Sequence, residues 1–123
     1  MTAAAHLMAR AGDTLADAEA SGVPAVRFVL AHQAALYAAA AIVAARAAST
    51  GGPPKSIWQA LADAAPALAP QARKFAAATP KRAAAEAGLP RAVSASDADG
   101  LLEDAREFMA AARQVSGPVQ PAP

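Results

Sequence analysis

Residues 24–48 read PAVRFVLAHQAALYAAAAIVAARAA, and this stretch decides the fold class. From Phe28 to Ala45 it carries no formal charge, and half of that run is alanine, the best helix former. Pro24 suits the first turn of a helix, where its missing N–H costs nothing. The stretch therefore predicts one long helix, which at 1.5 Å per residue spans roughly 37 Å.

The same run is long enough to suggest a membrane span, but its composition argues against one. Alanine is too weakly apolar to drive insertion as leucine and isoleucine do, and His32 and Gln33 interrupt the run. The first ten residues also lack the basic start and apolar stretch of a secretory signal. We therefore expect a cytoplasmic protein that does not associate with a membrane.

Composition limits the fold to one small all-α domain. The chain has 123 residues, of which 42 are alanine, and aromatic residues make up only 4%. Because β-branched residues are also few, a large sheet is ruled out. The chain contains no cysteine, which excludes a disulfide framework and a cysteine-ligated metal. Large apolar side chains are in short supply, so the core has little volume to bury.

Apolar spacing and helix-breaking residues divide the rest of the chain into further helices. The expected architecture is an up-down four-helix bundle with a short extra helix between the third and last helices. This domain covers residues 1–116, and a Pro-rich, disordered tail follows at 117–123. Besides the long helix, helices are expected at 2–20, at 56–65 with an angled continuation to 78 beyond Pro66, at 80–87, and at about 97–115.

Capping residues mark several of these helix ends. Ser56 with Gln59 three residues later resembles a capping box. Gly88 closes the short helix that starts at Thr79-Pro80, because glycine readily takes the backbone conformation that ends helices. Ser94 or Ser96 caps the last helix.

The long helix and the last helix each carry an apolar stripe that is wider than one neighbouring helix needs. Such stripes favour a homodimer, in which binding adds to folding stability. On the long helix the stripe consists of Val26, Val29, Leu30, Leu36, Tyr37, Ala40, Val43 and Ala44.

Trp58 is the only tryptophan, and it lies on the apolar stripe of the third helix. We expect it to be largely buried and to anchor the third helix against the second, near Leu36 or Tyr37.

Charge is unevenly distributed along the chain. Residues 51–92 carry six positive and two negative charges, whereas residues 93–123 carry two positive and five negative charges. We expect the basic middle to pair with the acidic last helix. Phosphate binding is the alternative role for the basic cluster, although Trp58 and Phe75 are the only aromatics near it to stack on bases. The cluster consists of Arg73, Lys74, Lys81, Arg82 and Arg91.

Three stretches carry a resemblance to a known family. They are residues 27–37 continuing to Arg46, residues 81–93 continuing to Phe108, and Ser56-Ile57-Trp58. Together they resemble the SAV-type HEPN domains of actinobacteria over roughly residues 5–115. The resemblance implies a four-helix up-down bundle that is usually dimeric. The wider superfamily includes metal-independent endoribonucleases and toxins, partners of nucleotidyltransferases, and non-catalytic RNA-binding modules. For this subgroup the resemblance implies no assigned activity.

Ribonucleases of the superfamily use an arginine followed by a histidine after four to six residues, and Arg27 and His32 match the shortest form. A histidine can act as the general acid or base on a ribose hydroxyl, and an arginine can hold the phosphate. Two features depart from the family pattern: the pair lies on the second helix rather than the last, and the polar position after the arginine holds Phe28. Residues five apart on a helix also point about 140° from each other.

The alternative for this pair is structural. His32 would then pack beside Tyr37 and Trp58 with its ring nitrogens hydrogen-bonded, and Arg27 would lie at the surface or in an ion pair. His6 stands alone near the N-terminus and forms no metal site with a second histidine. No metal and no cofactor are therefore expected.

Two hypotheses for the function follow. The favoured one is a non-catalytic, dimeric binding module related to RNA or nucleotides, with RNA or a nucleotidyltransferase-like protein as its partner. The other is a metal-independent endoribonuclease that uses Arg27 and His32. Because the pair does not lie where the family motif normally lies, we favour the first.

Overall fold

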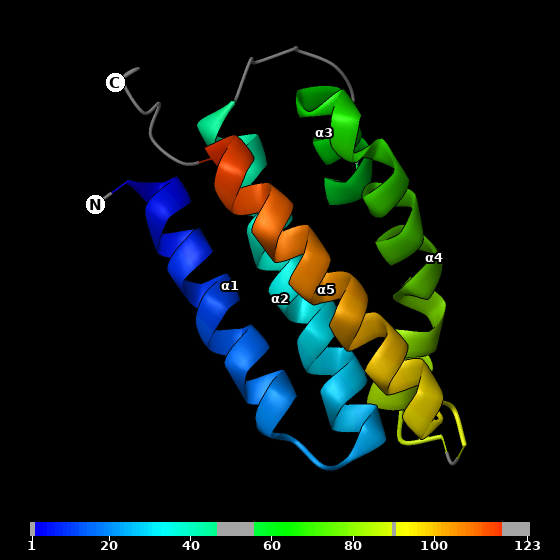
Figure 1. Cartoon of the computed structure of the whole chain (residues 1–123). Coiled ribbons are helices and arrows are strands. Elements are labelled where there is room, and N and C mark those ends of the chain that lie inside the picture. The colour runs from blue at the N-terminus through cyan, green and yellow to red at the C-terminus, as the bar shows by residue number, and fades with distance from the viewer. Residues whose placement is uncertain (1, 47–55, 90, 117–123) are drawn as a thin grey trace.

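A computed structural model describes residues 2–46, 56–89 and 91–116, and this part of the chain is helical and contains no strand. The expected all-α class is therefore confirmed. The elements are α1 (Ala3–Ala20), α2 (Pro24–Ala45), α3 (Ile57–Ala64), the single 3₁₀ turn η1 (Pro66–Leu68), α4 (Ala69–Glu86) and α5 (Ala95–Ser116). The four long helices lie side by side, and the chain reverses its direction from each to the next (Figure 1). The expected tail at 117–123 and the loop at 49–54 lie outside the described residues.

Local capping sets the helix ends. The Ser56 hydroxyl accepts the backbone N–H of Gln59 at 3.2 Å. Ser94, not Ser96, caps α5: its hydroxyl accepts the N–H of Asp97 at 2.9 Å, and its own N–H donates to the Asp97 carboxylate at 3.1 Å. These contacts start α5 two residues earlier than expected. The same Ser94 N–H, followed by the ammonium of Lys81, lowers the pKa of Asp97.

Gly88 ends α4 as expected from its sequence position. Its φ is +74°, in the left-handed region, and the N–H of Leu89 reaches back to the carbonyl of Ala84 at 3.2 Å. The N–H of Gly88 itself bonds the carbonyl of Ala85 at 3.0 Å. This pair of bonds is a Schellman motif, and it satisfies carbonyls that the last helical turn would otherwise leave open.

The prediction of a separate short helix at 80–87 is wrong, because α4 runs without interruption from Ala69 to Glu86. Pro80 lies inside α4, so the carbonyl of Ala76 loses its usual N–H partner. The helix tolerates this loss because Phe75 before the proline and Arg82 after it are both tied to α2. The short helix is instead α3, which ends before Pro66.

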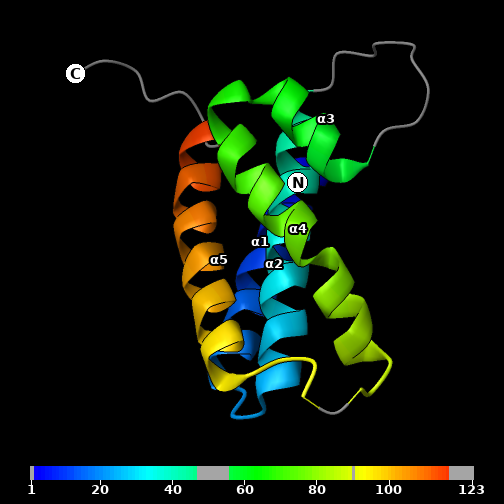
Figure 2. The ribbon, with the colours of Figure 1, turned by 90° about the vertical axis from the view of Figure 1, so that its right-hand side faces the viewer.

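The centre of the molecule is α2, which packs against α1, α3, α4 and α5. The buried face of α2 is mostly alanine, which lets neighbouring helix axes approach closely. α4 diverges from α5 along its length (Figure 2). The two helices are joined by aromatic side chains, because the ring centroid of Phe75 lies 5.4 Å from that of Phe108. The buried residues of α2 are Phe28, Ala31, His32, Ala34, Ala35, Ala38, Ala39, Ala41 and Ile42.

The broad apolar stripe of α2 therefore lies largely outside the core. Val26 is 45% exposed, and most of the other stripe residues are only half-buried. One helix, Pro24–Ala45, is long and apolar enough to cross a membrane by length and composition. Half of its most apolar window is buried in the bundle.

Trp58 is 7% exposed, and its ring stacks on that of Phe75 with the centroids 5.5 Å apart. It also meets His32 of α2 edge to face at 5.6 Å. Trp58 thus anchors α3 against α2, as the sequence predicts. Leu36 and Trp58 line one hollow between α2, α3 and α4, as expected for a contact near Leu36. Tyr37 has a different partner, because its hydroxyl accepts a hydrogen bond from Arg10 at 2.9 Å.

Trp58→Ala should lower the free energy of unfolding by about 3–5 kcal/mol, because it leaves a cavity between Phe75 and His32. Urea unfolding followed by circular dichroism measures this loss. Arg73→Ala, at an exposed position of α4, is the control and should change stability by less than about 0.5 kcal/mol. Wild-type indole emission at the wavelength of a water-exposed tryptophan would contradict the burial.

Candidate functional site

His32 lies in the middle of α2 and is 1% exposed. Its Nε2 is 2.9 Å from the backbone carbonyl oxygen of Phe75, which can only accept a hydrogen bond. Its Nδ1 is 3.1 Å from Nη1 of Arg82, which can only donate one. The two contacts together require a neutral ring with its proton on Nε2.

The environment of His32 also favours the neutral ring. Burial lowers the pKa of the imidazole from its ordinary value of 6.5, and the positive charge of Arg82 lowers it further. The carbonyl of Phe75 and the carboxylate of Glu86 oppose this shift without reversing it. His32 is therefore uncharged at neutral pH, with its one lone pair occupied by Arg82.

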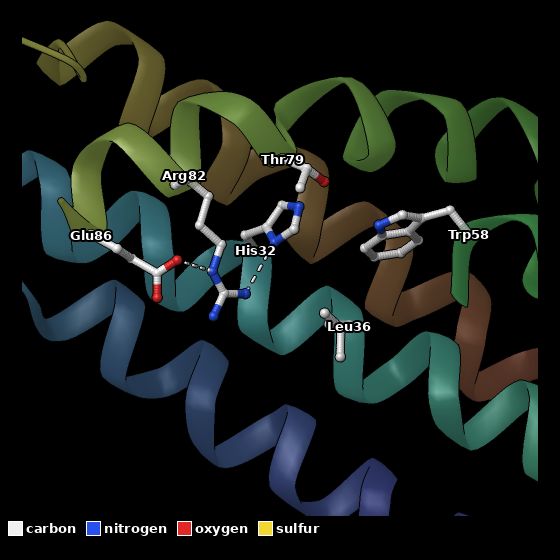
Figure 3. Close-up of a pocket in the computed structure, with 7 residues that line it drawn as sticks. His32, Leu36, Trp58, Thr79, Arg82 and Glu86 are labelled. Carbon is white, nitrogen blue, oxygen red and sulfur yellow. Dashed lines mark hydrogen bonds and ion pairs between the residues drawn. The ribbon is translucent and has the colours of Figure 1, made fainter. Parts of the chain in front are cut away.

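Arg82 connects α4 to α2 by its guanidinium group, as Figure 3 shows for its contacts with His32 and Glu86. Besides the bond to His32, its Nη2 donates to the side-chain oxygen of Gln33 at 2.7 Å. Its Nε donates to Glu86 at 3.2 Å, one turn later on α4. The side chain is 17% exposed, so a largely buried charge is held by two neutral acceptors and one half-exposed carboxylate. Three of its five N–H groups are used.

A hollow of about 250 Å³ lies beside these side chains. Its walls are mainly apolar, and its polar groups are the guanidinium of Arg82, the carboxylate of Glu86 and the hydroxyl of Thr79. That hydroxyl donates to the carbonyl of Phe75 at 3.2 Å. None of the lining side chains is an activated nucleophile. The lining residues are His32, Leu36, Trp58, Thr79, Arg82, Ala83 and Glu86.

Arg27 lies elsewhere. Its Nη1 is 2.6 Å from the carboxylate of Asp99 on α5, and its Nε and Nη2 donate to the last carbonyls of α1, those of Ala18 and Glu19, both at 3.3 Å. It lines a separate hollow of about 140 Å³ between the α1–α2 turn and the start of α5. The structure therefore does not bring Arg27 and His32 together, and the arginine that His32 meets is Arg82.

The basic cluster is divided among different roles. Lys74 pairs with Asp104 at 3.2 Å and Lys81 with Asp97 at 3.0 Å, so the expected pairing of the basic middle with the acidic last helix is present. These exposed pairs are worth little individually. Arg82 is turned inward to His32. The remaining two, Arg73 and Arg91, are exposed, and neither has an ion-pair partner among the described residues.

Within the described ranges, no three His, Asp or Glu side chains gather in a group that could hold a metal ion. The site holds a buried hydrogen-bond network of neutral His32, Gln33 and the charged Arg82, beside a small and mainly apolar hollow.

Fifty residues separate Arg82 from His32, so sequence spacing does not link them. One signal does exist: two adjacent polar residues, His32 and Gln33, inside an apolar helix need polar partners from another helix. Arg82 satisfies both of them, but the sequence offers several basic residues for that role.

Comparison with known protein families matches residues 18–113 to the family described as SAV_6107-like HEPN. The match covers more than three quarters of the chain, from the end of α1 through most of α5. No curated protein and no solved structure matches.

His32→Ala should lower the free energy of unfolding by about 1–3 kcal/mol, because it removes a buried ring and leaves the guanidinium of Arg82 without one acceptor. Thermal and urea unfolding measure the change. His6→Ala is the matched control, since His6 is the other histidine and is exposed. Equal stability of the two variants would show that the buried network contributes nothing to folding.

Stability should fall as the pH drops below about 6.5. Because the pKa of His32 is lowered in the folded protein, the unfolded chain takes up the proton first, and acid therefore favours unfolding. Above pH 6.5 this group contributes no pH dependence. The free energy of unfolding, measured at about pH 7.5 and about pH 5, should change less in His32→Gln than in wild type or His6→Ala. An identical change in all three proteins would contradict a buried, neutral His32.

Proposed function

The chain belongs to the SAV_6107-like HEPN family, and on that premise we propose that it is a non-catalytic interaction module that acts as a homodimer. The up-down four-helix plan implied by the family resemblance is part of this proposal, and the directions of α1, α2, α4 and α5 support it. A cytoplasmic location is also part of this proposal, and the half-buried apolar window of α2 supports it. RNA or a nucleotidyltransferase-like protein is the partner class that the same resemblance suggests.

The observation that carries the non-catalytic assignment is the enclosure of His32. A general acid or base must come within hydrogen-bond reach of the proton that it transfers. His32 is 1% exposed, and both of its ring nitrogens are already bonded, one to Phe75 and one to Arg82. His32 lines a hollow, but a substrate hydroxyl there would still have to displace one of these two partners.

Arg27 adds a second argument. In the ribonucleases that the resemblance suggests, the arginine would hold the phosphate close to the histidine. Here the guanidinium of Arg27 binds Asp99 and the last carbonyls of α1, in a hollow that His32 does not line. Releasing it would also break its two hydrogen bonds to the last turn of α1.

A metal-independent endoribonuclease is the second candidate, and one contact favours it. An arginine and a histidine do meet, because Nη1 of Arg82 is 3.1 Å from Nδ1 of His32. For this pair to reach RNA, α4 would have to move away from α2 and expose the ring.

A cleavage assay separates the two functions. Wild type, Arg27→Ala and His32→Gln are incubated with a labelled pool of mixed single-stranded RNA in the presence of a chelator. We expect the same background in all three and in buffer, because His32 is enclosed and Arg27 is held by Asp99. The contrary result is that wild type cleaves RNA and His32→Gln does not, although the variant melts like wild type. That result would show that the protein is a ribonuclease and not a non-catalytic module.

The homodimer is tested by mass. Light scattering across a concentration series should give about twice the 12.2 kDa of one chain. The melting temperature should rise with protein concentration, because dissociation precedes or accompanies unfolding. A constant single-chain mass at the highest concentration would refute the dimer and leave the non-catalytic assignment untouched.

A further inference from the structure

The outward face of α2 has no charged side chain between Phe28 and Ala45. The exposed side of a helix in a soluble protein ordinarily carries charged residues. Here the side of α2 outside its buried face carries Val29, Leu30, Leu36 and Val43, all half-buried, and Leu30, Leu36 and Val43 also pack against the core. Such a face is what a helix presents when another surface covers it.

The face continues into a groove between α2 and α4. A second hollow of about 250 Å³, almost wholly apolar, is formed by α2 from Ala25 to Leu30 and by Ala85 and Glu86 of α4. Glu86 also lines the hollow beside His32, so the two hollows adjoin at this residue. From Ala25 to Leu36 the groove follows α2 over roughly 17 Å.

Exposed apolar residues lie at the end of the bundle where α2 starts. Val26 is 45% exposed, Val23 immediately before α2 is 56% exposed, and Leu89 immediately after α4 is 58% exposed. The start of α2 and the connection from α4 to α5 lie at the same end of the bundle (Figure 1). These three are the exposed large apolar residues of the described chain; Val26 lines the groove, and Val23 and Leu89 lie at the same end of the bundle.

We propose that this groove and its exposed rim form the interface between two copies of the chain. The proposal rests on the homodimer proposed above and names the surface that makes it. In a two-fold dimer the same patch meets itself, so the patch must complement itself. The groove satisfies this condition because it carries one charge of each sign, on Arg82 and Glu86.

The arrangement of these two charges suits exchange between copies. Glu86 is 53% exposed and bonds Arg82 within its own helix at 3.2 Å, a type of surface pair that contributes little. Two guanidinium N–H groups of Arg82 remain free for a partner's Glu86. A patch with charges of one sign would repel its own copy.

A lipid surface fits the groove less well. Arg82 and Glu86 lie in the same groove as the apolar side chains, and both would have to enter the hydrocarbon region, which is costly. A second copy satisfies both the apolar and the charged groups.

The test uses charge substitutions on exposed positions, which leave the core intact. Val26→Glu and Leu89→Glu place new negative charges on the rim, and Ala16→Glu places the same charge on the exposed side of α1 as the matched control. Sedimentation velocity should show the dimer dissociation constant of each rim variant raised by about tenfold or more. Ala16→Glu should dimerise like wild type, and circular dichroism checks that all three fold.

A second measurement avoids destabilising substitutions. The chain has no cysteine, so Val26→Cys provides a single reactive thiol. A short bis-maleimide should cross-link this variant into dimers, whereas Ala16→Cys should remain single chains.

The outcomes are distinct. A wild-type dimer that Val26→Glu and Leu89→Glu leave unchanged, with no cross-linking through Val26→Cys, overturns this interface and keeps the homodimer. A wild-type monomer overturns both. The wild type could also be a monomer that sediments with vesicles of anionic lipid, and Val26→Glu could abolish this binding. That result would show that the same surface binds a membrane and not a second copy.

Discussion

One buried imidazole on α2 joins this helix to α3 and α4. His32 donates to the backbone of α4 at Phe75, accepts from the side chain of Arg82 further along α4, and meets Trp58 of α3 edge to face. A polar ring in an apolar interior is tolerated only when its hydrogen-bonding groups are satisfied. Its two bonds therefore set both the position of α4 along α2 and the protonation state of the ring.

The same contact explains how α4 stays continuous through Pro80. Proline removes a helical hydrogen bond and pushes against the preceding turn, and this often ends a helix. In α4 the turns on either side of Pro80 are held to α2, by the carbonyl of Phe75 on one side and by Arg82 with Gln33 on the other. Tertiary bonds thus offset the local defect. The same hydrogen bonds keep His32 enclosed. The contacts that hold α4 to α2 are therefore also the argument against a role for His32 in acid–base catalysis.

Alanine decides the rest of the packing. The buried face of α2 is mostly alanine, and its large apolar residues are Phe28 and Ile42. The other large apolar residues of the helix are half-buried or exposed, and Val26 is nearly half exposed. A core built on small side chains therefore leaves apolar surface outside, and the proposed dimer covers it. The high alanine content of α2 therefore links folding stability to the proposed dimerisation.

Local signals in the sequence determined the helical class and most helix ends, because they act within about four residues along the chain. Ser56 and Gly88 lie at the ends that they mark, and the spacing around Trp58 predicts its burial. The pairing of the basic middle with the acidic α5 also follows from composition. Tertiary structure alone decided that the alanine face of α2 is the inner one, that α4 passes through Pro80, and that His32 meets Arg82 rather than Arg27. Each of these depends on contacts between residues far apart in the chain, whose free energy outweighs the local preference.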